Sequence, residues 1–334
     1  MSPNLDKWTN RPSKYGALDA FVMGNGEPDS IISPGLLEEA RRAVGRAVYV
    51  PVYDTESVSI GSTRSVTISD SEGTSALYQV SFTIYSFGFT MVPAAHMNNE
   101  MDYQRDWNRK FLKYLYKLGA TLDSACLTAL NANKSQVFGS LLGKYTDVSD
   151  VFTAAYANKD EVIGDLSAAM HANDIYGDYR LIGNPGMEVQ IQRLLEKGNY
   201  NDTNRTIQLG DKMISYSNRI ADASGYIATG YIFNPSSVGM VFRSEREAIL
   251  GTKLPDGTEW SQELLPMLNI PIDTYFYYGV GDYNAFHGTS TADLTRGAKE
   301  HFGFAIEAAT VVAYNDDLAT YSNPIIKFQI AEEP

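Results

Sequence analysis

Cysteine is almost absent from this sequence, which contains a single one, Cys126, among 334 residues. One cysteine cannot form an internal disulfide, so no disulfide framework holds the fold together. Cys126 follows Leu122 and Ala125 in an apolar helical pattern, and we expect it to be a small core residue. The first residues also lack the apolar stretch of a signal peptide, so we expect the newly made chain to stay in the cytosol.

Long apolar runs and excess positive charge are missing as well. No window approaches the ~18 uninterrupted apolar residues of a membrane span, so membrane insertion is not expected. Lys and Arg number 27 against 40 Asp and Glu, a net charge of −13. This balance argues against nucleic acid or an anionic membrane as the main partner, although it leaves room for a local basic patch. With 44% hydrophobic residues, the chain can build one large core or two modest ones, which excludes wholesale disorder.

The motifs of common enzyme classes are absent too. The chain contains no H-E-x-x-H, G-x-S-x-G, Walker loop or complete G-x-G-x-x-G, so a nucleotide site is not expected. Its histidines lie far apart in sequence, and none has a second histidine or a cysteine at ligand spacing, which disfavours zinc. These histidines are His96, His171, His287 and His301.

Carboxylates and tyrosines leave one enzymatic alternative, a glycosidase, in which paired acids cleave the sugar bond. Glu307 lies between Ile306 and Ala308 on an alternating strand, which favours a polar residue of a half-buried sheet over a catalytic one. Aromatic strand residues more often pack against neighbours than form a sugar platform. We therefore expect no enzyme, no cofactor and no metal. The residues weighed are Asp178, Asp282, Glu300 and Glu307 as acids, and Tyr275, Tyr277, Tyr278 and Tyr283 as a platform.

The N-terminal residues 1–30 are interrupted by glycine and proline and are expected to form a loop-like arm. Such a segment should fray on its own, so we expect a neighbouring subunit to hold it. A short helix is predicted within residues 31–46, with Ser33 as its N-cap and Pro34 at its first position.

Residues 47–90 change to a period of two, as in the run Tyr78, Val80, Phe82 and Ile84. Turn-rich polar segments separate the alternating stretches, which predicts one or two long antiparallel hairpins, with further strands at Val58–Ile60 and Val66–Ile68. A hairpin this long has too few apolar residues at its tip to pack on itself. We therefore expect it to project from the molecule and to lie on something else.

A helical period of unusual length follows, beginning at Asn98 or Asn99 and ending near Asn133. At about 1.5 Å per residue, this helix would be roughly 50 Å long. Its other face carries the densest group of cations in the chain, which we interpret as a solvated face in preference to a binding surface. The cations are Arg105, Arg109, Lys110, Lys113 and Lys117, with Asp106 among them.

The remaining chain alternates helix and strand and then becomes rich in strands. Capping patterns predict helices from Glu161 and from Pro185, and Asn234–Ser237 has a further helix-start signature. Buried strands are predicted at 179–182, 212–216 and 225–233, and closing strands at 270–278, 302–308 and 326–330.

This order of elements resembles the major capsid protein of tailed bacteriophages, the Hong Kong 97-type capsid fold, which is an α+β fold. The order is a loose arm, a short helix, a long hairpin, a very long helix, an α/β segment and returning strands. The resemblance implies an N-terminal arm at 1–30, a short helix at 31–46, an extended loop at 47–90, a peripheral domain with its spine helix at 91–154 and 266–334, and an axial domain at 155–265.

The resemblance also implies a function. The chain would be a structural protein that self-assembles into hexamers and pentamers of an icosahedral phage head around double-stranded DNA. It would reside in the virion after assembly in the host bacterial cytoplasm, with scaffolding protein, portal and decoration proteins as partners. The acidity of the chain then fits a wall that encloses DNA without holding it.

Two features depart from some members of the family. Those that crosslink their subunits use a lysine in the extended loop, whereas no lysine occurs here between Lys14 and Lys110, so we expect a shell without crosslinks. With Met1 ahead of a short arm, we also expect scaffolding to come from a separate protein. The alternatives are an encapsulin-like compartment shell and, in a different class, a secreted carbohydrate-active enzyme or adhesin.

Aromatic residues in the arm and in the hairpin are the expected apolar anchors between subunits. Each of them could equally serve internal packing. They are Trp8, Tyr15, Tyr49, Tyr53, Tyr78 and Phe82.

Overall fold

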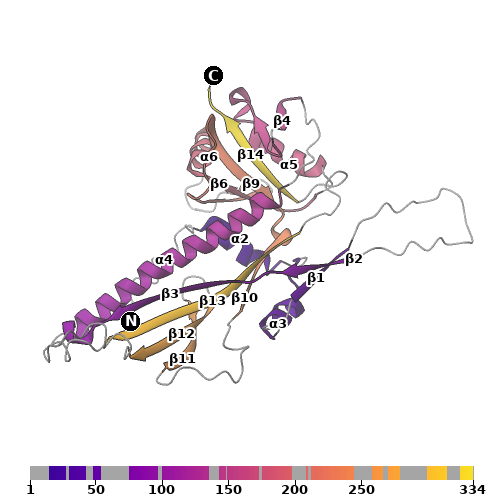
Figure 1. The fold of residues 1–334 in the computed structure, drawn as a ribbon. Coiled ribbons are helices and arrows are strands. Elements are labelled where there is room, and N and C mark those ends of the chain that lie inside the picture. Colours follow the sequence, from indigo (N-terminus) through magenta and orange to yellow (C-terminus); the bar gives the residue numbers. More distant parts are fainter. Residues whose placement is uncertain are drawn as a thin grey trace, which may run out of the picture.

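The protein contains two large β-sheets, a separate two-stranded hairpin and one long helix, α4 (Glu100–Ala132) (Figure 1). No helix in the described part of the chain is both long and apolar enough to cross a membrane. The structure, a computed structural model, describes residues 15–27, 30–42, 48–53, 75–96, 100–134, 143–147, 149–172, 175–197, 208–209, 212–243, 258–265, 270–278, 299–313 and 324–333.

The five-stranded sheet lies along α4 and is antiparallel throughout. Its long strand β13 pairs with β12 and β3 over its first half and with β10 over its second half, and β11 pairs with β12. Aromatic side chains fill the space between this sheet and α4, because alternate strand residues share one face. The strands are β3 (Thr83–Met91), β10 (Val238–Arg243), β11 (Thr258–Leu265), β12 (Ile270–Tyr278) and β13 (Glu300–Val312).

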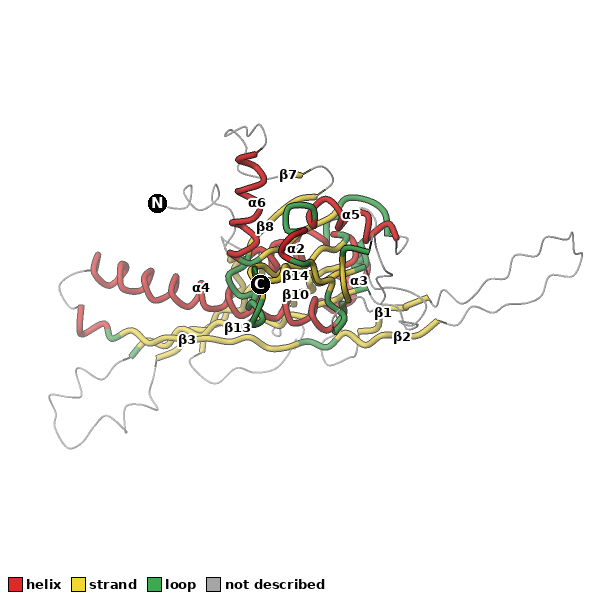
Figure 2. Tube along the Cα trace, turned by 90° about the horizontal axis from the view of Figure 1, so that it is seen from above, coloured by secondary structure: helices red, strands yellow, loops and turns green. Residues whose placement is uncertain are grey.

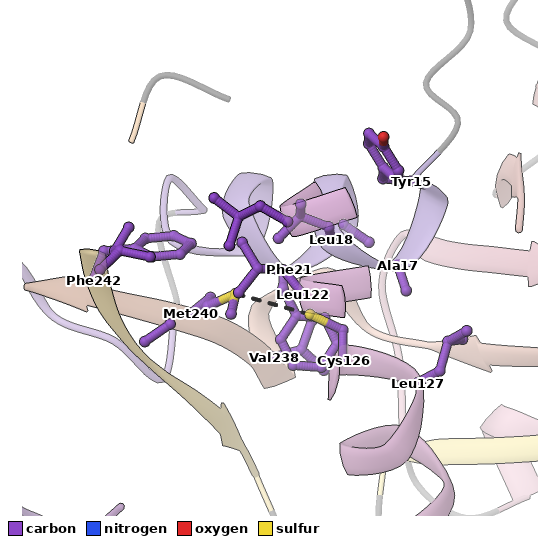
Figure 3. Packing of buried hydrophobic residues seen from close by; sticks show 14 of the residues in the cluster. Tyr15, Ala17, Leu18, Phe21, Leu122, Cys126, Leu127, Val238, Met240 and Phe242 are labelled. Atoms are coloured by element: carbon purple, nitrogen blue, oxygen red, sulfur yellow. Dashed lines mark hydrogen bonds between the residues drawn. The ribbon is translucent and has the colours of Figure 1, made fainter. Parts of the chain in front are cut away.

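Helix α4 has 33 residues and confirms the predicted long helix. In its N-terminal half, Trp107 and Phe111 contact the sheet, with ring centroids 5.9 Å from Phe89 and 5.2 Å from Phe304 respectively. In its C-terminal half, Cys126 is fully buried, as predicted for a core residue. Figure 3 shows the Cys126 thiol directed at the Met240 sulfur, 3.9 Å away.

The seven-stranded sheet lies at the C-terminal end of α4 (Figure 1). Helices α5 (Val162–Ala172) and α6 (Pro185–Lys197) contribute buried residues to its core, and both confirm predicted helices. Asn184 caps α6, because its Oδ1 accepts a hydrogen bond from the Met187 amide at 2.9 Å. The strand order is β4 (Tyr145–Asp147), β5 (Phe152–Ala154), β14 (Ile325–Ala331), β9 (Tyr226–Phe233), β6 (Tyr179–Gly183), β8 (Lys212–Tyr216) and β7 (Gln208–Leu209).

The two sheets take strands from both sides of the expected domain bounds. Strand β14, expected among the closing strands of the peripheral domain at 266–334, lies in the seven-stranded sheet between β5 and β9. Strands β10 and β11, expected within 155–265, lie in the five-stranded sheet instead. The chain therefore crosses between the two sheets more often than its linear order suggests.

The helix predicted after Asn234 is also wrong, because the chain makes only one turn there. Asn234 accepts a hydrogen bond from the Ser236 amide and begins the short 3-10 helix η3 (Pro235–Ser237). Strand β10 follows at once, and all six of its residues are buried. A continuous apolar run suits a buried strand as well as a helix, and pairing with β13 decides between them here.

Part of the expected arm is a helix packed in the core. Helix α2 (Gly16–Gly24) buries Ala17, Leu18 and Phe21 against α4 and β10 (Figure 3). Gly24 permits a close approach, since a Cβ atom there would lie 2.2 Å from the Val238 carbonyl oxygen. Residues 1–14 lie outside the described residues.

The predicted hairpin begins with β1 (Val48–Tyr53), which pairs antiparallel with β2 (Ser75–Val80). Strand β2 continues the direction of β3 past the end of the five-stranded sheet, so the hairpin projects from the molecule (Figures 1 and 2). The further strands expected near Val58–Ile60 and Val66–Ile68 lie outside the described residues. Short helices complete the fold: α3 (Pro34–Arg42), η1 (Pro93–His96) and η2 (Tyr156–Asn158).

Candidate functional site

The most distinctive surface is the projecting hairpin, defined here as the paired strands β1 and β2. Its root packs on a small apolar cluster in which Val48 and Val80, paired across the hairpin, are both buried. The cluster is completed by residues from the segment before α3, from β10 and from β13, which are Ile32, Val241, Ala309 and Val311. The hairpin is therefore anchored at its base by the subunit's own core, while its strands extend beyond the sheet.

Helix α3 supports this root. Its predicted N-cap is confirmed, because the Ser33 hydroxyl accepts a hydrogen bond from the Leu36 amide at 3.2 Å. Leu36 and Leu37 on the same helix pack against the buried cluster. The short helix thus helps to set the direction in which the hairpin leaves the molecule.

A buried ion pair lies beside the same root. Arg243 on β10 and Glu307 on β13 stand directly opposite each other in the sheet and form a salt bridge, each side chain being about nine-tenths buried. The Arg243 guanidinium also lies 3.9 Å from the centre of the Phe82 ring, between β2 and β3. Glu307 is thus a partner of Arg243 and more buried than the half-buried sheet position expected from its alternation.

The predicted contact residues of the hairpin differ in exposure. The side chain of Tyr49 is 47% exposed, whereas Phe82 is half-buried under Arg243 and against the root cluster. Tyr53 and Tyr78 lie on β1 and β2, but their side chains are outside the described residues. Tyr49 is therefore the most exposed of the predicted contact residues whose side chains the structure describes.

The predicted contact residues of the arm are not brought to that surface. Trp8 lies outside the described residues. Tyr15 is buried against α4, where its hydroxyl donates to the Tyr116 carbonyl oxygen at 3.0 Å and its ring lies beneath Arg219. This ring serves the subunit's own core, which is the internal packing left open for each of these aromatic residues.

Asp123 is a buried residue that sequence reasoning missed. Its Oδ1 accepts hydrogen bonds from the amides of Ala17 and Leu18, at the start of α2, at 3.0 and 3.1 Å. Its Oδ2 accepts from the Ser217 hydroxyl at 2.7 Å and from Arg219 at 3.2 Å. This carboxylate joins α4, α2 and the loop after β8. The only signal in the sequence for its burial was the presence of an acid within an apolar helical run.

The carboxylates considered for catalysis are not brought into one site by the described contacts. Glu300 accepts a hydrogen bond from the Tyr103 hydroxyl, and Glu307 pairs with Arg243. Asp282 and Tyr283 lie outside the described residues, as does the side chain of Tyr278. Tyr277 stacks on His301 with ring centroids 4.7 Å apart, which is packing between neighbouring strands.

Open clefts flank the five-stranded sheet. One cleft of about 640 Å³ lies beside α4 and β3, and Lys110, Lys113 and Tyr114 line its helical side. A smaller cleft of about 250 Å³ lies near Trp260 and Trp107. Within the described ranges, no group of three or more His, Cys, Asp or Glu side chains is placed to hold a metal ion.

Solved structures with this architecture come from bacteriophages. The structure titled "Mycobacterium phage Adephagia" is 13% identical, with a TM-score of 0.52 over 97% of this chain and 92% of that chain. The structure titled "Capsid of Ralstonia phage GP4" is 10% identical, with a TM-score of 0.51 over 97% of this chain and 93% of that chain. No protein-family model and no curated protein matches the sequence.

These likenesses define the fold over nearly the whole length of both chains. The α+β capsid fold expected from the sequence is confirmed. At identities of 13% and 10%, the likeness concerns the fold.

Proposed function

We propose that this chain is the major capsid protein of a tailed bacteriophage. The observation that carries the proposal is the fold shared with a phage capsid over 97% of this chain. The proposal also accounts for a hairpin that projects from the molecule and exposes Tyr49, because such an element gains its burial from a neighbouring subunit.

In the proposed shell, copies of the chain form hexamers and pentamers of an icosahedral head around double-stranded DNA. Each interface is repeated many times, so modest contacts suffice to hold a closed particle. The protein resides in the virion after assembly in the host cytoplasm, together with a portal, a separate scaffolding protein and any decoration proteins. Its role is structural, without catalysis.

The alternatives gain no support from the comparisons. The solved structures of like fold are titled as phage structures, which favours a phage head over an encapsulin-like compartment. The carboxylates weighed for a secreted carbohydrate-active enzyme include Glu307, which the fold commits to Arg243. In an adhesin, the hairpin would bind a different molecule and not another copy of this chain.

Electron microscopy of the expressed full chain tests the proposal. Closed icosahedral particles, formed from the chain alone or with co-expressed scaffolding protein, are the expected result. A chain that stays monomeric at high concentration under both conditions would contradict the proposal.

A further inference from the structure

The outer face of α4 carries a stripe of cations, defined here as Arg105, Arg109, Lys113 and Lys117. Each follows the previous one by four residues, so consecutive members lie about 6 Å apart along the helix and the stripe spans roughly 18 Å. All four side chains are exposed, and that of Arg105 is 75% exposed. This geometry is a ridge of positive charge on a rigid support, and it winds about 120° around the helix because four residues exceed one turn of 3.6.

Most of the stripe lies on the side of α4 that faces away from the packed sheet. Residues that pack on the five-stranded sheet, such as Trp107 and Phe111, lie on the opposite side of the helix. Figure 2 shows α4 running beside β3 and β13 on that side. Lys113 also lines the cleft of about 640 Å³, next to Lys110, so positive charge continues from the stripe into a recess.

The positive charge is largely uncompensated within the described residues. Only Arg105 has an ion pair, a long one of 3.9 Å to the exposed Asp102, and no described carboxylate pairs with Arg109, Lys113 or Lys117. Between residues 107 and 122 there is no Asp or Glu, although the chain as a whole carries a net charge of −13. Local attraction for an anion therefore exists in a molecule that otherwise repels anions.

The chemistry of this face suits phosphates better than a protein surface. Protein interfaces are depleted in lysine and centred on buried aromatic or apolar anchors, whereas this face offers mainly long cationic side chains. A DNA duplex presents one phosphate per about 1.7 Å of its axis, so some ten phosphates lie along a stripe of this length. Flexible cations can pair with several of them without any demand on base sequence.

We infer that the stripe on α4 is a DNA-backbone contact surface, which holds the enclosed duplex weakly and without sequence preference. The inference rests on the proposed function, because the subunit meets DNA as part of the shell wall. It modifies the expectation from the overall acidity: most of the wall repels DNA, and this helix face touches it.

Binding of the purified full chain to a random-sequence DNA duplex of about 30 base pairs tests the inference. The variant Lys113→Gln/Lys117→Gln removes two charges while keeping good helix formers. The matched control, Lys159→Gln/Arg193→Gln, removes two charges near the seven-stranded sheet. We expect the stripe variant to weaken binding about tenfold or more at about 50 mM salt, and to reduce the slope of log K against log salt by about 1.8.

Three outcomes are decisive against the inference. The first is unchanged affinity in the stripe variant, and the second is an equal loss in the control variant. The third is a stripe variant that fails to form particles without DNA while the control forms them, because the stripe would then be a contact between copies of the chain. Failure of the wild-type chain to form particles, both alone and with co-expressed scaffolding protein, would contradict the proposed function and leave the DNA measurement interpretable.

Discussion

Single buried polar residues decide where distant parts of this chain meet. Asp123 supplies the acceptor that the first amides of α2 lack, and it does so from more than 100 positions away in sequence. It also neutralises Arg219, whose side chain is 24% exposed. The carboxylate therefore holds the start of α2 and the loop after β8 against α4.

Replacing Asp123 with Asn tests this role. The amide keeps the shape but cannot accept hydrogen bonds at both ends and leaves Arg219 without its counter-charge. We expect the free energy of unfolding of the full chain to fall by about 2–3 kcal/mol, measured by urea denaturation. The control is Asp102→Asn on the exposed face of α4, where a change within about 0.5 kcal/mol is expected. Equal effects at the two positions would contradict the assignment.

Cys126 makes a prediction about pH. Burial, aided by the nearby Asp123 carboxylate, raises the pKa of its thiol well above the ordinary value of 9.0. The folded chain therefore keeps a proton that the unfolded chain loses, so this contribution to stability is complete below the unfolded pKa and declines as pH rises. Between about pH 8 and 9.5 we expect a loss of about 1 kcal/mol in urea denaturation. The same decline in Cys126→Ala would show that another group causes it.

At the scale of elements, the root of the hairpin depends on a buried ion pair between two strands. Arg243 and Glu307 join β10 to β13, and the Phe82 ring lies over the guanidinium where β2 passes into β3. A buried pair of this kind contributes little net stability, but the loss of one partner leaves an uncompensated charge. We expect the pair to favour this strand register, because a shifted register would leave both charges buried and unpaired.

Two substitutions separate these effects. Glu307→Ala alone is expected to reduce the free energy of unfolding by about 3–5 kcal/mol, because the buried Arg243 guanidinium loses its salt bridge to Glu307. The double variant Arg243→Met/Glu307→Leu should recover most of that loss, since it removes both charges and fills similar volume. Chemical denaturation of the single and double variants measures the difference. A double variant as unstable as the single one would contradict this account.

The elements that the sequence predicted are those whose signals are local. Helices α4 and α6 carry their own apolar periodicity, and α6 also carries its Asn184 cap. Helix α2 was missed because it is short, begins and ends with glycine, and is capped by Asp123 from another part of the chain. The pattern before β10 was misinterpreted because strand pairing, a nonlocal contact, overrides a helix-start signature.

The candidate surfaces were predictable to a lesser degree. Exposure of Tyr49 follows from its place in an alternating strand, but the burial of Tyr15 depends on α4 approaching α2. The cations of α4 can be found in the sequence. That they stay exposed became clear only from the structure, in which the sheet packs on the other side of the helix. Tertiary contacts thus decide which side chains are available to partners.

At the scale of the whole molecule, the absence of lysine from the hairpin bears on how a shell is held together. No lysine occurs between Lys14 and Lys110, so the hairpin lacks an amine that could form an isopeptide bond. We expect particles boiled in detergent to release a single band near the 36.9 kDa of one chain. A ladder of covalent oligomers on the gel would contradict this prediction.

Assembly should also separate from folding at Tyr49. Its ring is half exposed, and the root of the hairpin is anchored by the buried side chains of Val48 and Val80. Tyr49→Ala should therefore leave the free energy of unfolding within about 0.5 kcal/mol of the wild type. If the ring packs on a neighbouring subunit, its loss recurs at every copy of the interface. We then expect the concentration needed for particle formation, measured by light scattering, to rise about tenfold for each ~1.4 kcal/mol lost per contact.

Tyr49→Phe supplies the matched control, because it keeps the apolar ring and removes only the hydroxyl. It should assemble at close to the wild-type concentration if burial of the ring is what matters. Equal impairment of Tyr49→Phe and Tyr49→Ala would place the effect in a hydrogen bond of the hydroxyl. If Tyr49→Ala assembles at the wild-type concentration, Tyr49 is not an important contact between subunits. The other aromatic residues of the hairpin would then have to make that contact.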